Sequence, residues 1–149
     1  MPRTLALTAL AAAALGAAAL PATVASQEPA DVAYRPGYFI GRTADRGKAL
    51  VHIRGDRLTF WGQYVRIHCP GRKPGFLKVG EHGSWPMPAD GRFSISGRGK
   101  GGAWELRGRA TTEAVTGTLE LKVRVRGDGE VQTCTSPRTR FTAPWRGPL

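Results

Sequence analysis

The chain has 149 residues and a formal net charge of +11, with 22 basic residues against 11 acidic ones. A field of this sign attracts polyanions such as nucleic acid, acidic cell-wall polymers, anionic lipid and acidic glycans. Arginine dominates the basic residues, however, and a chain rich in Ala, Gly, Arg and Pro is also typical of a GC-rich genome. The charge therefore has two readings, one functional and one compositional. The two cysteines do not have the C-x-x-C spacing, which argues against a zinc finger and a redox pair.

The first segment has the layout of a secretory signal peptide. One early cation, Arg3, precedes an uncharged run over residues 4–24, and small residues follow. Cleavage is predicted after Ala25, with Ala22 and Ser26 as alternative sites. A membrane anchor is the competing reading, although the run is alanine-rich and barely long enough to span a bilayer. The mature protein is therefore expected to be secreted or extracytoplasmic, and no later segment is apolar enough for a membrane span.

Three regions are predicted: a signal peptide over 1–25, a flexible lead-in over 26–36 and one β domain over 37–147. In an exported chain the two cysteines, Cys69 and Cys134, most simply form one structural disulfide. About 124 residues after cleavage are enough for a single core.

From Gly37 onward, short runs of alternating apolar and polar residues are punctuated by Gly, Pro and Asp, which is typical of β-strands. In the clearest strand, "TLELKVRVR" (118–126), leucines and valines alternate with charged residues. Residues 71–90 contain three prolines, and Pro70 directly precedes them, which predicts the loosest region, with only a short strand around 76–79. Other strands are predicted at 38–43, 49–53, 57–61, 64–69, 92–96, 104–111 and 131–135, the last extending through 140–145.

The predicted fold class is all-β: an antiparallel meander of about eight short strands in a sandwich or flattened barrel, with one disulfide and little or no helix. Two Arg-Gly-Asp tripeptides fit this fold as hairpin turns, so integrin binding is not expected. In the first, Gly55-Asp56 predicts a type II′ turn in which Ile53 faces Leu58 and Val51 faces Phe60.

The second tripeptide predicts a three-residue loop over 127–129. In this register Arg126 faces Glu130 and Val125 faces Val131, and Gly129 takes the left-handed conformation.

The alternation also predicts an irregularity near residue 62. Leu58 and Phe60 have one parity, whereas Val65, Ile67 and Cys69 have the other, so a bulge is expected at Gly62. The same parity places Trp61 on the outer face of the sheet. Trp85, in "SWPMP", is predicted to be an exposed aromatic side chain on a loop.

No pattern points to catalysis, a metal or a cofactor, and none of these is expected. His52, His68 and His82 share no ligand spacing, and the serines lack a nucleophile elbow. The glycine-rich stretch "GRGKGG" (97–102) lacks the spacing and the Ser or Thr of a P-loop. It is predicted to be a hairpin loop, with a secondary anion contact as the alternative.

Several short motifs resemble a family of small secreted, largely uncharacterised single-domain proteins of actinobacteria and other bacteria. The matching pieces are "GYFIGRT" (37–43), Cys69, "DGRFSI" (90–95), "VTGTLEL" (115–121), Cys134 and "FTAPW" (141–145). The resemblance implies a compact antiparallel β domain with one disulfide. It brings no catalytic residue or ligand to this chain, which is also unusually basic for the family.

The sequence therefore favours a non-catalytic binding module for an anionic surface or extracellular polymer. The alternative is a structural or interaction protein of the envelope, or an inhibitor, that binds another secreted protein. An enzyme would require one of the histidines to meet a carboxylate in a pocket. The residues predicted to contact the polymer are Arg98, Lys100, Arg107, Arg109, Lys122, Arg124 and Arg126.

Overall fold

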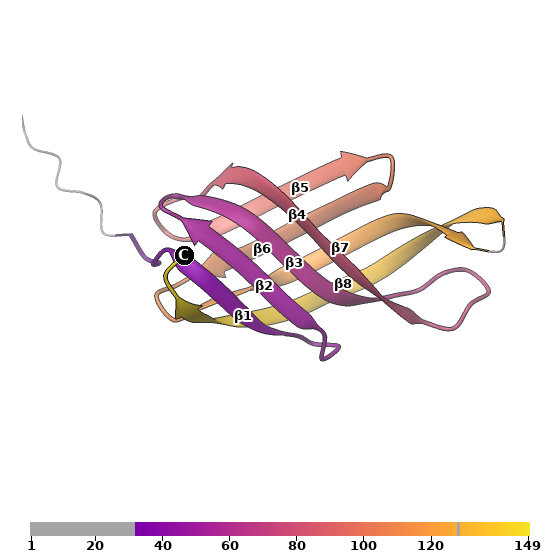
Figure 1. Ribbon diagram of the computed structural model, residues 1–149, viewed down its shortest axis with the longest axis horizontal. Helices are drawn as coiled ribbons and strands as arrows, with labels where there is room; N and C mark the ends of the chain where they lie inside the picture. The colour runs from indigo at the N-terminus through magenta and orange to yellow at the C-terminus, as the bar shows by residue number, and fades with distance from the viewer. Residues whose placement is uncertain (1–31, 128) are drawn as a thin grey trace, which may run out of the picture.

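The computed structural model describes residues 32–127 and 129–149, and this part of the chain contains eight β-strands and no helix (Figure 1). Each strand is antiparallel to its neighbours, which confirms the predicted all-β class. The strands are longer than predicted, with up to 18 residues in the last. Their bounds are β1 Gly37–Thr43, β2 Lys48–Arg54, β3 Arg57–Ile67, β4 Gly75–Pro86, β5 Arg92–Gly99, β6 Gly102–Ala110, β7 Ala114–Gly127 and β8 Glu130–Gly147.

The strands form one sheet in the order β4-β3-β2-β1-β8-β7-β6-β5. Strands β1 to β4 form one half of the sheet, in which each strand pairs with the next one along the chain, and strands β5 to β8 form the other half in the same way. The pairing of β1 with β8 joins these two halves. The sheet curls on itself into a nearly closed barrel, as Figure 1 shows, and its two edges are β4 and β5. The flattened-barrel prediction is therefore the correct one of the two architectures.

The barrel interior is filled by the apolar residues of the alternating pattern, as β7 illustrates. Val115, Leu119 and Leu121 are buried, whereas Lys122 and Arg124 are exposed. Burying such side chains stabilises the fold by about 1.5–3 kcal/mol each. The largest fully buried side chains are Trp61, Phe39, Ile53, Leu58, Leu106, Leu119, Gln63, Val51, Val65, Val115 and Cys134.

The expected phase change in β3 exists, but it lies at Thr59 rather than at Gly62. Ile53 pairs with Leu58 and the next residue of β2, His52, pairs with Phe60, so Thr59 is the additional residue of a bulge. Gly62 is in regular register. The bulge turns Phe60 outward and Trp61 inward, so the predicted outer-face position of Trp61 is wrong: its side chain is 1% exposed.

Residues 71–90 were predicted to be loose, but most of them form the 12-residue strand β4. As an edge strand, β4 tolerates its glycines and places Pro86 at its last position, where no ladder bond is lost. Trp85 is therefore not on a loop. It is half-buried opposite Leu58, and its ring meets Trp104 edge to face at 5.9 Å.

The first Arg-Gly-Asp turn has the predicted loop. Arg54 pairs with Arg57 around Gly55-Asp56, and Gly55 alone has a positive φ, +57°, as a type II′ turn requires. Ile53 faces Leu58 as predicted, but the bulge replaces the predicted pair of Val51 and Phe60.

The second turn is one residue shorter than predicted. Gly127 pairs with Glu130 and Arg126 pairs with Val131, so the predicted pairs Arg126–Glu130 and Val125–Val131 are wrong. Gly129 has the predicted positive φ, +84°, and residue 128 lies outside the described part of the chain. Beyond this turn β8 continues without a break to Gly147, which confirms the predicted extension through 140–145. It contains a bulge at Pro137, because Leu119 pairs with Thr139 whereas Leu121 pairs with Ser136.

The predicted disulfide is present and joins two strands that are not neighbours in the sheet. Cys69 follows β3 and Cys134 lies within β8, with Cα atoms 4.3 Å apart. Because β1 and β2 are short, β3 and β8 meet beyond their ends, where His68 and Thr135 exchange two backbone hydrogen bonds of 2.8 and 3.0 Å. The disulfide therefore fastens this end of the barrel and agrees with an extracytoplasmic location.

The predicted signal peptide falls outside the described residues, as does most of the predicted lead-in. The described end of the lead-in packs on the barrel: Tyr34 is buried with its hydroxyl 3.4 Å from the Met87 carbonyl, and the Arg35 guanidinium lies over the Trp145 ring. Among residues 32–127 and 129–149, no helix is long and apolar enough to cross a membrane.

Gly41 is expected to be required for the close approach of the paired strands β1 and β8. A Cβ at this position would lie 1.9 Å from the Thr142 carbonyl oxygen, which is backbone and cannot swing away. Gly41→Ala should lower the free energy of unfolding by about 1–3 kcal/mol, measured by urea denaturation. The control is Gly75→Ala, where a Cβ meets nothing within 4 Å; equal losses in both variants would show that β1 and β8 do not approach this closely.

Candidate binding face

The outward surface of β5, β6, β7 and β8 carries most of the predicted polymer-contacting residues, and we call it the basic face. Arg107 lies between Ser94 and Thr118, and Lys122 lies between Ala103 and Thr135, in rows that cross the strands. The side chains are exposed and share one parity along each strand. The cations of this face are Arg92, Arg98, Arg107, Arg109, Lys122, Arg124, Arg126, Arg138 and Arg140.

Six of the seven predicted residues are therefore on one face, and the seventh, Lys100, is exposed in the turn between β5 and β6. Arg92, Arg138 and Arg140 also belong to this face and were not predicted. Arg92 could have been found from the alternation in β5. The two β8 arginines could not, because the bulge at residue 137 changes which residues of β8 point outward.

Two carboxylates lie in the middle of the basic face. Glu105 and Glu120 are directly opposite each other on β6 and β7, a pairing of like charges that would be unfavourable alone. Each is compensated by an arginine: Arg107 Nε donates to Glu105 at 2.8 Å, and Arg138 donates to Glu120. In the described part of the chain, neither Lys122 nor Arg124 has an ion-pair partner.

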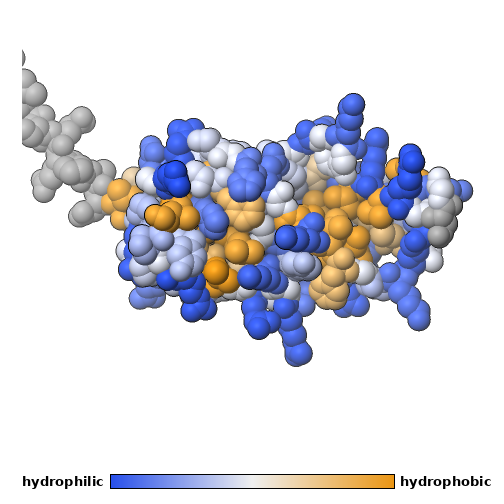
Figure 2. All heavy atoms as spheres, viewed as in Figure 1, coloured by the Kyte–Doolittle hydropathy of each residue, from blue (hydrophilic) through white to orange (hydrophobic). Residues whose placement is uncertain are grey.

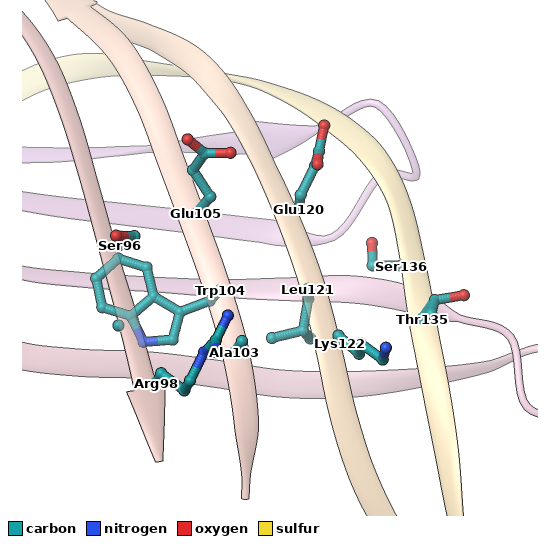
Figure 3. A pocket seen from close by; sticks show the side chains of 11 residues that line it. Ser96, Arg98, Ala103, Trp104, Glu105, Glu120, Leu121, Lys122, Thr135 and Ser136 are labelled. Atoms are coloured by element: carbon teal, nitrogen blue, oxygen red, sulfur yellow. The ribbon is translucent and has the colours of Figure 1, made fainter.

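A shallow pocket of about 570 Å³ lies beside this acidic pair. Figure 3 shows Glu105 and Glu120 pointing to the same side of it, while Arg98 and Lys122 lie at its other end. Ala103, a small residue on β6, separates the two cations along their row. The pocket thus offers cations at one end and hydrogen-bond acceptors at the other.

Hydroxyl groups rather than aromatic rings fill the space between the cations. Ser94, Ser96, Thr118, Thr133 and Thr135 have the outward parity. The aromatic residues of the same four strands are buried or half-buried on the inner side: Phe93, Trp104, Phe141 and Trp145. The basic face therefore suits charged and hydrogen-bonding groups. Trp104 also lines its pocket, but this residue is half-buried and its ring packs against Trp61, with centroids 4.7 Å apart.

The opposite half of the barrel carries a row of ring side chains instead. Tyr38, His52, Phe60 and His82 are successive cross-strand neighbours on β1, β2, β3 and β4. Phe60 lies between the two histidines, with ring centroids 5.0 Å from His52 and 4.5 Å from His82. Figure 2, viewed from this half, shows hydrophobic side chains reaching the surface among charged ones. His52 points outward, because its neighbours Val51 and Ile53 are buried residues of β2.

The pKa of His52 is lowered from its ordinary value of 6.5, first by burial and second by the charge of His82. Below about pH 6.5 the unfolded chain takes up a proton that the folded His52 resists, so stability falls as the pH falls through this window. His52→Gln should therefore lose less stability than the wild type between pH 8 and pH 5 in chemical denaturation. His68→Gln, at an exposed position, is the control; identical pH profiles for the wild type and His52→Gln would contradict the prediction.

No catalytic arrangement is found in the part of the chain that the structure describes. It contains no group of three or more His, Cys, Asp or Glu side chains that could hold a metal. Ser84 is not oriented by His82: its hydroxyl accepts a hydrogen bond of 2.5 Å from Arg57 Nε. The assignment as a non-enzyme stays a prediction.

Comparisons of the chain with protein-family models, with curated proteins and with solved structures give no match. The resemblance to small secreted bacterial β proteins therefore stays a prediction as well.

Proposed function

We propose that the protein is a non-catalytic binding module that holds an anionic extracellular or cell-surface polymer on its basic face. The observation that carries the proposal is the gathering of Arg98, Arg107, Arg109, Lys122, Arg124 and Arg126 on one side of one sheet. A polymer with regularly spaced anionic groups would contact several of these cations at once, and the summed contacts would provide the affinity.

The pattern of the basic face favours a hydroxylated polymer, such as an acidic polysaccharide or a polyol phosphate, over nucleic acid. Exposed serine and threonine hydroxyls alternate with the cations, and Glu105 and Glu120 can accept hydrogen bonds from ligand hydroxyls. Single-stranded nucleic acid is usually held by stacking on exposed aromatic rings as well as by charge. Trp104, the aromatic residue that lines the pocket of the basic face, is half-buried against Trp61.

The test is a charge reversal in the middle of the basic face. Lys122→Glu with Arg124→Glu should weaken binding to the preferred polymer by about tenfold or more, because two exposed cations next to the bound chain become repulsive. The measurement is titration calorimetry with a teichoic-type polyol phosphate, a sulfated glycan and DNA. Both side chains point to solvent, so the variant is expected to fold normally.

The matched control is Lys48→Glu with Arg54→Glu, an equal change of net charge on exposed residues of β2. It should weaken binding by only about threefold, through the overall field. Equal losses in the two variants would mean that the net charge alone attracts the polymer. That result would favour the alternative, an envelope protein that binds another secreted protein.

A further inference from the structure

A cleft of about 370 Å³ lies where the barrel is not closed, between the edge strands β4 and β5. Its inner wall is apolar and includes Trp61, Val79, Trp104, Leu121 and Val123. The hairpin between β5 and β6 forms part of its rim through Arg98, Gly99, Gly101 and Gly102, and a Cβ at Gly99 or Gly101 would meet nothing within 4 Å. These glycines therefore add no side chain to their part of the rim.

The inner wall of the cleft is aromatic. Trp61 and Trp104 lie with ring centroids 4.7 Å apart, and the half-exposed Trp104 presents aromatic surface to the cleft. The indole N–H of Trp61 is buried and has no acceptor within the described residues.

The rim adds a charge preference. Lys78 and Arg98 line it together with one acid, Glu81, so the entrance is net positive. A volume of this size is within the range of small-molecule pockets, which are mostly apolar with a few placed polar groups.

We propose that this cleft binds a small aromatic molecule that bears an acidic group. The aromatic body would pack against Trp104, and the anionic group would lie at the rim beside Lys78. The inference does not depend on the proposed function, because the cleft opens between the barrel edges and its anionic group is assigned to Lys78, which lies outside the basic face. Arg98 borders both the cleft and the basic face.

The test uses two fluorescent probes with the same aromatic framework. 8-Anilinonaphthalene-1-sulfonate carries an anionic group, whereas N-phenyl-1-naphthylamine does not. The folded wild-type domain should bind the sulfonate at one saturable site, with an affinity about fivefold higher than for the neutral probe. Lys78→Gln should remove this preference, whereas Lys48→Gln, on exposed β2 surface, should keep it.

A second pair of variants tests the aromatic wall. Trp104→Leu should lower the affinity for both probes, whereas Trp145→Phe, which removes a tryptophan outside the cleft, should not. Equal affinities of the wild type for the two probes, or binding unchanged by both Lys78→Gln and Trp104→Leu, would overturn the proposal. Polymer titrations of Lys78→Gln separate the two proposals. This variant keeps an intact basic face, so its polymer binding should equal that of the wild type whether or not the cleft binds the probes.

Discussion

Replacing both cysteines, by Cys69→Ala with Cys134→Ala, is expected to lower the free energy of unfolding by about 4 kcal/mol on the chain-entropy model. The disulfide joins residues separated by 65 positions, so its loss releases a long loop in the unfolded chain. It also connects β3 to β8 at the end of the barrel where β1 and β2 do not reach. Urea denaturation of the oxidised wild type and the double variant measures the difference.

A matching result is expected without mutation. The wild type in a strong thiol reductant should show the same loss, while the reductant should leave the double variant unchanged. A loss of less than about 1 kcal/mol in both experiments would contradict a stabilising role for the bond.

Phe39→Ala is expected to cost about 3–5 kcal/mol, because it removes a fully buried ring and leaves a cavity. Phe39 lies on β1, which pairs with both β2 and β8, so the cavity would form where the two halves of the sheet join. Chemical denaturation is again the measurement.

The matched control for this variant is the next residue of the same strand. Ile40 has the opposite parity and is half-exposed, so Ile40→Ala should cost clearly less than Phe39→Ala. Similar losses for the two variants would mean that β1 does not present Phe39 to the interior.

The alternation of apolar and polar residues was sufficient to predict the fold class and the sharing of one face by Lys122, Arg124 and Arg107. Strand parity is a local property, so β7 and β6 could be oriented without knowing their partners. The pairing of β1 with β8, which joins the two halves of the sheet, brings together the two ends of the β domain and leaves no local signal.

The errors in side-chain direction have one physical cause: a single inserted residue reverses every later side chain on a strand. The bulge at Thr59 reversed the direction of Trp61. Gly62, where the bulge was predicted, is in regular register. The bulge at residue 137 hid Arg138 and Arg140 in the same way. The tip of the second hairpin, one residue shorter than predicted, shows that turn composition alone did not determine loop length.

Strand β4 was missed because Gly and Pro were read as signals of a loop. On an edge strand these residues are tolerated, since one side of the backbone has no partner. This error also concealed the cleft, because neither edge of the barrel can be recognised before β4 is known to be a strand.

The most direct test of the proposed basic face is the salt dependence of polymer binding by the folded, oxidised domain. Non-specific attraction falls steeply with salt, because each neutralised anion releases a counterion. We predict that a hydroxylated anionic polymer stays bound at about 0.5 M salt, where a folded control protein of equal net charge has dissociated. Binding that decreases in parallel with the control for every polymer would contradict the proposal and make the charge compositional.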